Sequence, residues 1–209
     1  MARPVNANAD ETRRRIREAA SDLFAIHGIS GASIREIARV AQVNPAMVSH
    51  YFGGKAGLYE ACINRLYGQL DQGQVLFLEA LASGDSIGPL IARTVRAAYA
   101  LARENKGLIR LIMRDVLDRG ELDPERRERV LGPFLSEGSR ILATHTPRSP
   151  VALRIALQSI VYLTVRYTLC TDDELRSITG LKADMENAVA DYLETFALEQ
   201  LGILKEHAA

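Results

Sequence analysis

Apolar residues recur every three to four positions along most of this 209-residue chain, which is the period of helices that bury one face. Between Asp10 and His27 the apolar residues fall on one face and four arginines lie mostly on the other. Gly28 follows at a position suited to ending that helix. The alternation typical of half-buried strands is missing from the sequence. The pattern therefore predicts an all-α protein.

A second helix is predicted to begin at Ser33. Ser33 and Glu36 have the spacing of a capping box, in which the Ser hydroxyl accepts from the N–H of Glu36 and the Glu carboxylate accepts from the N–H of Ser33. Ile34, Ile37 and Ala38 then share one face, as in a helix that packs on one side.

A third helix is predicted to follow at once. Asn44 is a good N-cap, and Pro45 suits the first helical position because its missing N–H has no helical partner there. Two caps so close together leave Gln42 and Val43 to form a tight turn.

The third helix divides into an inner and an outer face. Val48 and Phe52 lie four positions apart and are expected to face inward. The outward residues are small, polar or aromatic: Asn44, Ala46, Met47, Ser49, His50 and Tyr51. Because so short a helix is marginal alone, the pattern indicates a helix-turn-helix whose last helix is displayed for contact with DNA. Two ordinary core helices joined by a turn are the alternative.

Several linked motifs in the first quarter to third of the chain resemble the tetracycline-repressor (TetR) family of bacterial transcription regulators. They are TRRRIREAASDLFAIHG, SIREIARVAQV, NPAMVSHYF and GGKAGLYEA. Two positions depart from the family pattern: Gln42 stands where glycine is usual, and Ser49 where an aromatic residue is frequent. A positive φ at Gln42 would carry a cost that glycine avoids.

The resemblance implies a three-helix DNA-binding domain over residues 1–54, with a mobile arm at about residues 1–9. A connecting helix then leads into a helical effector-binding and dimerisation domain over residues 55–209. Arg3 in the arm could touch DNA, although an unstructured terminus is the simpler interpretation.

The resemblance also implies roles in binding double-stranded DNA. Ser33 and Lys55 open helices whose N-termini favour phosphate, and Tyr51 resembles the family's phosphate-binding ring. The positions expected to reach base edges or adjacent phosphates are Asn44, Ala46, Met47, Ser49 and His50. Since this surface lacks Arg and Gln, we expect DNA shape to share the specificity with direct readout. Arg14 is a further phosphate candidate, with a solvated helix face as the alternative.

The distribution of charge agrees with this division. The chain has no formal net charge, yet the stretch up to Lys55 holds eight basic and five acidic residues, a net charge of +3. Cys62 and Cys170 fit no metal-ligand spacing, and a disulfide between them is not expected in a reducing compartment. Redox control through either thiol is a weak alternative.

Beyond the connecting helix, which is expected to run from Lys55 toward Leu81, the periodicity predicts helices only. Their expected ranges are Ile87–Arg103, Lys106–Arg119, Pro124–Ala143, Pro150–Cys170, Asp172–Thr179 and Leu181–Leu201. Pro133 should kink its helix. The last two long helices are apolar around much of their circumference, and the resemblance implies that they form a four-helix bundle in a homodimer. Packing within one monomer is the alternative.

A small-molecule effector is expected in the C-terminal domain, although the sequence does not locate its pocket. The candidates are polar, polarizable or aromatic residues on apolar helices: Tyr67, Tyr99, Arg110, Met113, Arg114, Phe134, Tyr162 and Arg166. Arg110 and Arg166 carry most information, because a buried guanidinium needs an acidic partner in the protein or in a ligand. Each residue singly is more often part of a core or an interface.

Together with the resemblance, the sequence therefore predicts a cytoplasmic, homodimeric transcriptional repressor that binds a palindromic operator and is released by a small-molecule effector. No cofactor, catalytic residue or metal site is expected, because the usual enzyme motifs are missing and the four histidines are scattered. No apolar run is long enough for a membrane span, and the N-terminal residues MARPVNANADETRRR lack the apolar centre of a secretory signal, so neither is expected. A constitutive or protein-regulated DNA-binding dimer without a pocket is the main alternative.

Overall fold

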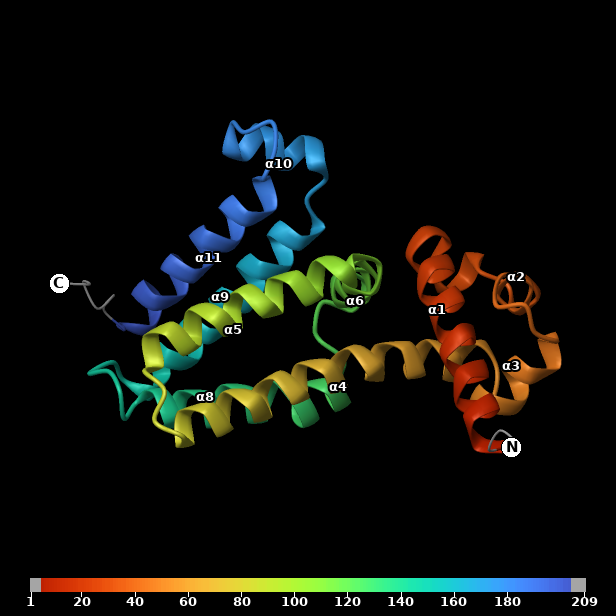
Figure 1. Ribbon diagram of the computed structural model, residues 1–209, viewed down its shortest axis with the longest axis horizontal. Coiled ribbons are helices and arrows are strands. Elements are labelled where there is room, and N and C mark those ends of the chain that lie inside the picture. Colours follow the sequence, from red (N-terminus) through yellow and green to blue (C-terminus); the bar gives the residue numbers. More distant parts are fainter. Residues whose placement is uncertain (1–4, 204–209) are drawn as a thin grey trace. The chain divides into compact units, whose positions relative to one another are not determined.

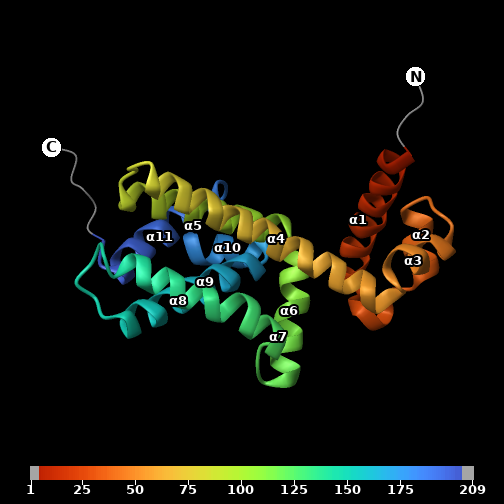
Figure 2. The ribbon, with the colours of Figure 1, turned by 90° about the horizontal axis from the view of Figure 1, so that it is seen from below.

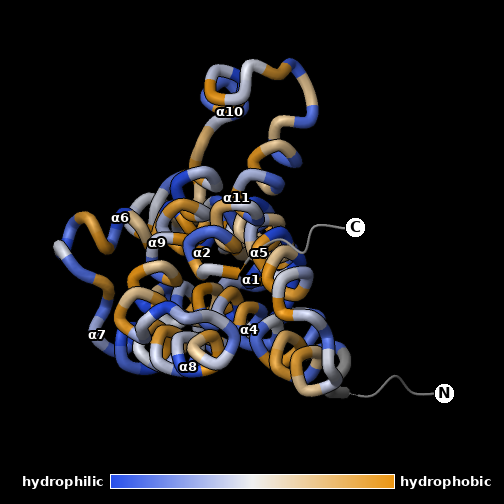
Figure 3. Tube along the Cα trace, turned by 90° about the vertical axis from the view of Figure 1, so that its left-hand side faces the viewer, coloured by the Kyte–Doolittle hydropathy of each residue, from blue (hydrophilic) through white to orange (hydrophobic). Residues whose placement is uncertain are grey.

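The computed structural model describes residues 5–203 and contains helices without strands in that range (Figure 1). The helices are α1 (Val5–Gly31), α2 (Ile34–Val40), α3 (Pro45–Phe52), α4 (Lys55–Ala82), α5 (Ile87–Glu104), α6 (Lys106–Arg119), α7 (Pro124–Arg126), the π-helical turn η1 (Arg127–Leu131), α8 (Gly132–Leu142), α9 (Pro150–Leu169), α10 (Asp172–Thr179) and α11 (Met185–Leu201). Polar and apolar positions are interleaved along the labelled helices (Figure 3). The all-α prediction is confirmed.

The helices group into two compact units. The first comprises the chain up to Gln69 together with Asn105–Asp115, and the second comprises Leu70–Glu104 and the chain from Val116 onward. Helices α4 and α6 therefore contribute residues to both units. The domain boundary expected after residue 54 stays a prediction, because close packing within a unit does not show which segment folds independently.

The first unit is built around apolar side chains from five helices. Fully or almost fully buried residues come from α1 (Ile16, Ala20, Phe24), α2 (Ile37, Ala38), α3 (Val48), α4 (Leu58, Ile63, Leu66) and α6 (Leu108). These are the positions that the three-to-four periodicity places on inner faces. This core therefore supports the two short helices, which would be marginal alone.

Helix α1 starts earlier than expected and is interrupted where expected. It begins at Val5, so residues 5–9, which we assigned to the terminal arm, are helical; Ala9 is a strong helix former. Arg3 lies outside the described residues. Gly28 has φ +70° and ψ 173°, which breaks the helix as its position predicts.

Helix α6 lies against α1 within the first unit. A Cβ atom added at Gly107 would overlap the Cβ of Ala25. The two backbones can therefore approach this closely only because one of the two facing residues has no side chain.

The second unit is a helical bundle in which α5 and α9 pack against α11. Helix α8 lies beside α9 (Figure 2). The core of the second unit includes Leu153 and Ile160 of α9 together with Leu198 and Leu201 of α11. Tyr99, Cys170 and other buried residues form a neighbouring cluster.

Two helix boundaries differ from those expected in this unit. The range Pro124–Ala143 is divided by the π-helical turn Arg127–Leu131, and Pro133 lies in the first turn of α8, where its missing N–H is tolerated. Helix α11 begins at Met185 instead of Leu181, because Asp184 has a positive φ of 62°.

Candidate DNA interface

The predicted caps of α2 and α3 are present. The hydroxyl of Ser33 accepts from the N–H of Glu36 at 3.1 Å, which is the Ser half of the expected capping box. Oδ1 of Asn44 accepts from the N–H of Ala46 at 2.9 Å, and Pro45 opens the helix. Short-range polar contacts thus set where both helices start.

The turn between α2 and α3 is held from α1. Gln42 adopts the positive φ of 54° that glycine would allow more easily. The guanidinium of Arg15 donates to the carbonyl oxygen of Gln42 at 2.9 Å and to that of Ala41. We had assigned Arg15 only to a charged outer face of α1, because the sequence carries no signal for a contact across 26 residues.

Helix α3 presents most of the expected face to solvent. Asn44, Ala46, Ser49 and His50 are exposed. Met47 and Tyr51 are half-buried, whereas Val48 is completely buried, as predicted. The polar surface is therefore displayed on a helix that is anchored by its opposite side.

Tyr51 lies in a group of ring and cation contacts. The guanidinium carbon of Arg13 lies 4.9 Å from the centroid of the Tyr51 ring, which is a cation–π arrangement. The rings of His50 and Phe52 approach the same ring edge-on, at 5.0 and 6.5 Å. These contacts restrict the ring and bring a positive charge next to it.

Lys55 connects the start of α4 to the segment before α2. Its ammonium donates to the carbonyl oxygens of Ala32 at 3.1 Å and Ser30 at 3.4 Å. These bonds place the charge of Lys55 near the N-terminus of α2, which Ser33 caps. Two positive features therefore lie together, the ammonium and the helix dipole.

Arg14 is less available for phosphate than its position in the sequence suggests. Its guanidinium is hydrogen-bonded to the carboxylates of Glu11, at 2.5 and 2.8 Å, and Glu18, at 2.7 and 2.8 Å. These contacts raise the pKa of Arg14 above its ordinary value and largely neutralise its charge locally.

Comparison with known proteins agrees with this geometry. Residues 16–62 match the family of bacterial regulatory proteins described as the tetR family. The HTH-type transcriptional regulatory protein RaaS of Mycobacterium tuberculosis is 30% identical over 167 residues, which cover 71% of this chain and 78% of that protein. The chain belongs to the TetR family. It is therefore a DNA-binding transcription regulator.

Similarity in sequence to an individual regulator can cover a small part of the chain, whereas similarity in fold extends further. The HTH-type transcriptional regulator SrpR of Pseudomonas putida is 41% identical over 63 residues, 30% of each chain. A TetR-like transcriptional regulator from Rhodococcus sp. RHA1 superposes with a TM-score of 0.59 over 97% of this chain and 98% of that chain, at 19% identity. The shared fold thus covers both units.

The effector-binding candidates of this TetR-family chain are divided between the two units. Tyr67, Arg110, Met113 and Arg114 belong to the first unit, and Tyr99, Phe134, Tyr162 and Arg166 to the second. Arg110 and Arg166 are exposed, so the burial that we expected of them is wrong. Arg166 has its own acidic partner in the chain, because it donates to Glu174 at 3.1 Å.

Tyr99 is the buried exception among these candidates. It is 3% exposed, and its hydroxyl has no hydrogen-bond partner within the described residues. Burial raises the pKa of Tyr99 to about 12, since a phenolate would be poorly solvated there.

Two hollows contain some of the candidates. One is lined by Ala25, Ile26, Gly28, Arg110, Leu111 and Arg114, all in the first unit. The other is lined by Leu135, Arg154, Ile155, Gln158, Ser159 and Tyr162, all in the second. Over residues 5–203, no cluster of three His, Cys, Asp or Glu side chains is placed to bind a metal ion. In the same range no helix has the length and apolar character of a membrane span.

Proposed function

We propose that this protein is a transcriptional repressor that binds a palindromic operator as a homodimer and is released by a small-molecule effector. The observation that carries the proposal is α3, which exposes Asn44, Ser49 and His50 while Val48 anchors it in the core. A protein with this role works in the cytoplasm, where the operator lies.

The proposed contacts divide into phosphate binding and base readout. Ser33, Tyr51 and Lys55 bind phosphates, and the contact of Arg13 with the Tyr51 ring strengthens that end of the surface. The residues facing base edges or adjacent phosphates are Asn44, Ala46, Met47, Ser49 and His50. Ala46 and Met47 offer only apolar contact, for instance to a thymine methyl group.

The proposed dimer forms through α9 and α11. Val151, Ile155 and Tyr162 of α9 are 67%, 63% and 59% exposed, and Tyr192 of α11 is 52% exposed. Large apolar side chains at this spacing leave one face of the helix pair uncovered in a single chain. A two-fold pairing of this face buries it and supplies the two recognition helices that a palindrome requires.

The effector acts by its different affinity for the DNA-bound and released conformations. A constitutive or protein-regulated dimer is the second candidate, because the candidate pocket residues are divided between the two units. A thermal-shift screen of the full chain against diverse small molecules separates the two, because a ligand of the folded state raises the melting temperature. The repressor model requires at least one compound that both raises this temperature and weakens operator binding.

DNA recognition is tested first, by selecting bound duplexes from random DNA at two salt concentrations. Wild type should recover one palindrome. Tyr51→Phe and Lys55→Ala should weaken binding without changing the consensus, because they remove phosphate contacts. Arg65→Ala, an exposed change on α4 away from this surface, is the matched control. Recovery of no sequence above the salt-sensitive background would refute the proposal.

The dimer is tested by sedimentation equilibrium. Ile155→Asp should shift the protein toward monomer, because it places a charge in the proposed apolar interface. Ile178→Asp changes an exposed residue of α10 and should leave the association unchanged. Equal association of both variants would exclude this face.

A further inference from the structure

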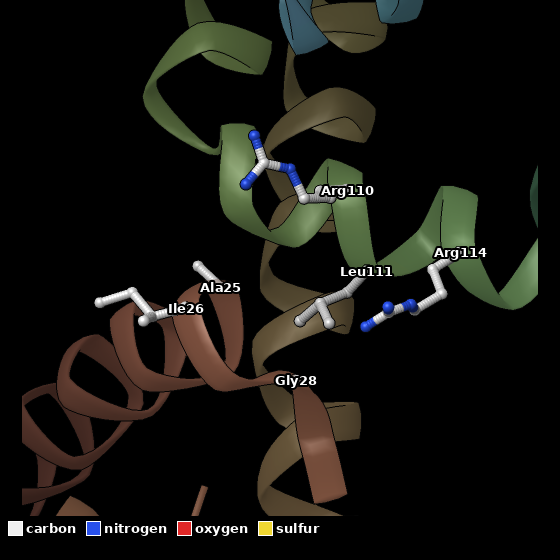
Figure 4. Close-up of a pocket in the computed structure, with 6 residues that line it drawn as sticks. All are labelled: Ala25, Ile26, Gly28, Arg110, Leu111 and Arg114. Atoms are coloured by element: carbon white, nitrogen blue, oxygen red, sulfur yellow. The ribbon is translucent and has the colours of Figure 1, made fainter. Parts of the chain in front are cut away.

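A hollow of about 230 Å³ lies between the end of α1 and α6, inside the first unit. Figure 4 shows Arg110 and Arg114 projecting from α6 on either side of Leu111, with Ala25 and Ile26 on the neighbouring turn of α1. The hollow is lined by positive charge and by apolar surface, which is the combination that an amphipathic anion requires.

Most arginines within residues 5–203 have an ion-pair or hydrogen-bond partner in the chain, whereas the two arginines of the hollow belong to the minority without one. Arg96 and Arg103, for example, form ion pairs with carboxylates. Within residues 5–203, neither Arg110 nor Arg114 has a carboxylate or hydrogen-bond partner. Their guanidinium groups are therefore free to bind an oxyanion, and guanidinium matches the geometry of carboxylate and phosphate.

Arg114 lies next to Gly28, where α1 is interrupted. Nη1 of Arg114 would lie 3.7 Å from a Cβ atom built at Gly28, where φ is +70°. The guanidinium thus lies over a stretch of backbone without a side chain.

We propose that this hollow binds a small organic anion with one oxyanion head, a carboxylate or a phosphate, and a short apolar tail. The head pairs with Arg114, and Arg110 supplies the second positive charge from the other side of Leu111. The tail lies along Leu111, Ala25 and Ile26, the last of which has 73% of its surface exposed.

The location of the hollow also gives it a route to the DNA-binding helices. This step rests on the proposed function. Gly107 and Ala25 bring α6 and α1 into close contact beside the hollow, and Arg15 of the same α1 holds the turn before α3. A ligand that changes the packing of α1 on α6 therefore acts on the recognition helix within one unit.

Binding is tested without DNA, by calorimetric titration of the full chain with hexanoate and hexyl phosphate. Hexanol and inorganic phosphate present the tail and the head alone. We expect saturable binding of an amphipathic anion, weakened about tenfold by Arg114→Gln, because it removes a charge-assisted contact. Arg110→Gln should weaken it less, because it removes only the second positive charge nearby. Arg65→Gln is the matched exposed control. The stronger of the two anions identifies the head group.

Three results would overturn the site: no saturable binding of either anion, equal binding by Arg114→Gln and wild type, or equal binding of hexanol. Operator affinity is then measured with and without the bound anion. A change in wild type that is lost in Arg114→Gln supports regulation through this hollow, and no change excludes it. Failure of the unliganded protein to bind any operator would refute the proposed function and leave the calorimetric result for the site unaffected.

Discussion

The guanidinium of Arg15 donates to the carbonyl oxygen of Gln42 at 2.9 Å, so a residue of the first helix supports the turn of the helix-turn-helix. The supported residue has a positive φ and an exposed side chain. The side chain of Gln42 thus contributes little to the stability of the turn. Its backbone is instead held by the hydrogen bond from Arg15.

Replacing Arg15 should therefore destabilise the DNA-binding unit. We expect Arg15→Gln to lower the free energy of unfolding by about 1–2 kcal/mol, because two carbonyl oxygens lose a charged donor. Arg14→Gln removes only exposed ion pairs and should change it little. Urea denaturation measures both. Equal effects of the two changes would show that the bonds from Arg15 do not support the turn.

Replacing Gln42 by glycine should stabilise the protein. The positive φ of Gln42 is strained for a residue with a Cβ atom, so Gln42→Gly should raise the free energy of unfolding by about 0.5–1 kcal/mol. Gln42→Ala keeps the Cβ atom and is the control. A stabilisation of equal size in the alanine variant would show that backbone strain is not the cause.

The close contact between α1 and α6 should have room for a Cβ atom at only one of the two facing positions, 25 or 107. Gly107→Ala should lower the free energy of unfolding by about 1–3 kcal/mol, because the new methyl group overlaps Ala25. Adding Ala25→Gly should restore part of the loss, because it removes the overlapping Cβ atom but places a glycine inside α1 and leaves the Cα of residue 25 close to the new methyl group. Gly68→Ala, where a Cβ atom meets nothing within 4 Å, should instead stabilise α4 by about 0.5–1 kcal/mol. If the double variant were no more stable than Gly107→Ala, the close contact would not be the reason.

Tyr99 should make stability depend on pH in the alkaline range. Its pKa is raised to about 12 in the folded protein, whereas a phenol in the unfolded chain ionises near about 10. The stability that comes from keeping this phenol protonated is fully present below pH 10. It is lost as the pH rises toward 12, because the unfolded chain ionises first. At pH 11 the free energy of unfolding of wild type should have fallen by about 1 kcal/mol more than that of Tyr99→Phe.

Urea denaturation at pH 8 and pH 11 measures this effect. At pH 8 Tyr99→Phe should be at least as stable as wild type, because the buried hydroxyl that it removes has no hydrogen-bond partner in the part of the chain that the structure describes. An identical pH dependence of the two proteins would contradict the raised pKa.

Local signals allowed much of the DNA-binding unit to be predicted. Ser33, Asn44 and Pro45 act within three residues of their own position, so spacing alone indicates the caps. Gly28 interrupts α1 for an equally local reason. The inward direction of Val48 follows from helical periodicity.

Contacts between distant segments could not be predicted in this way. The bonds from Arg15 to the turn and from Lys55 to Ala32 join residues more than twenty positions apart. The exposure of Arg110 likewise depends on how α6 lies against α1, which one sequence does not reveal. Choosing arginines as pocket candidates by residue type alone therefore selected residues from both units.

The π-helical turn Arg127–Leu131 has a consequence for chain length. The N–H of Gly132 donates to the carbonyl oxygen of Arg127, five positions earlier, so this turn holds one residue more than an α-helical turn. A related protein with one residue fewer at this point could form an uninterrupted α-helix with the same core face. A single-residue gap here in an alignment would therefore mark an insertion absorbed by one turn, with the helices on either side keeping their register.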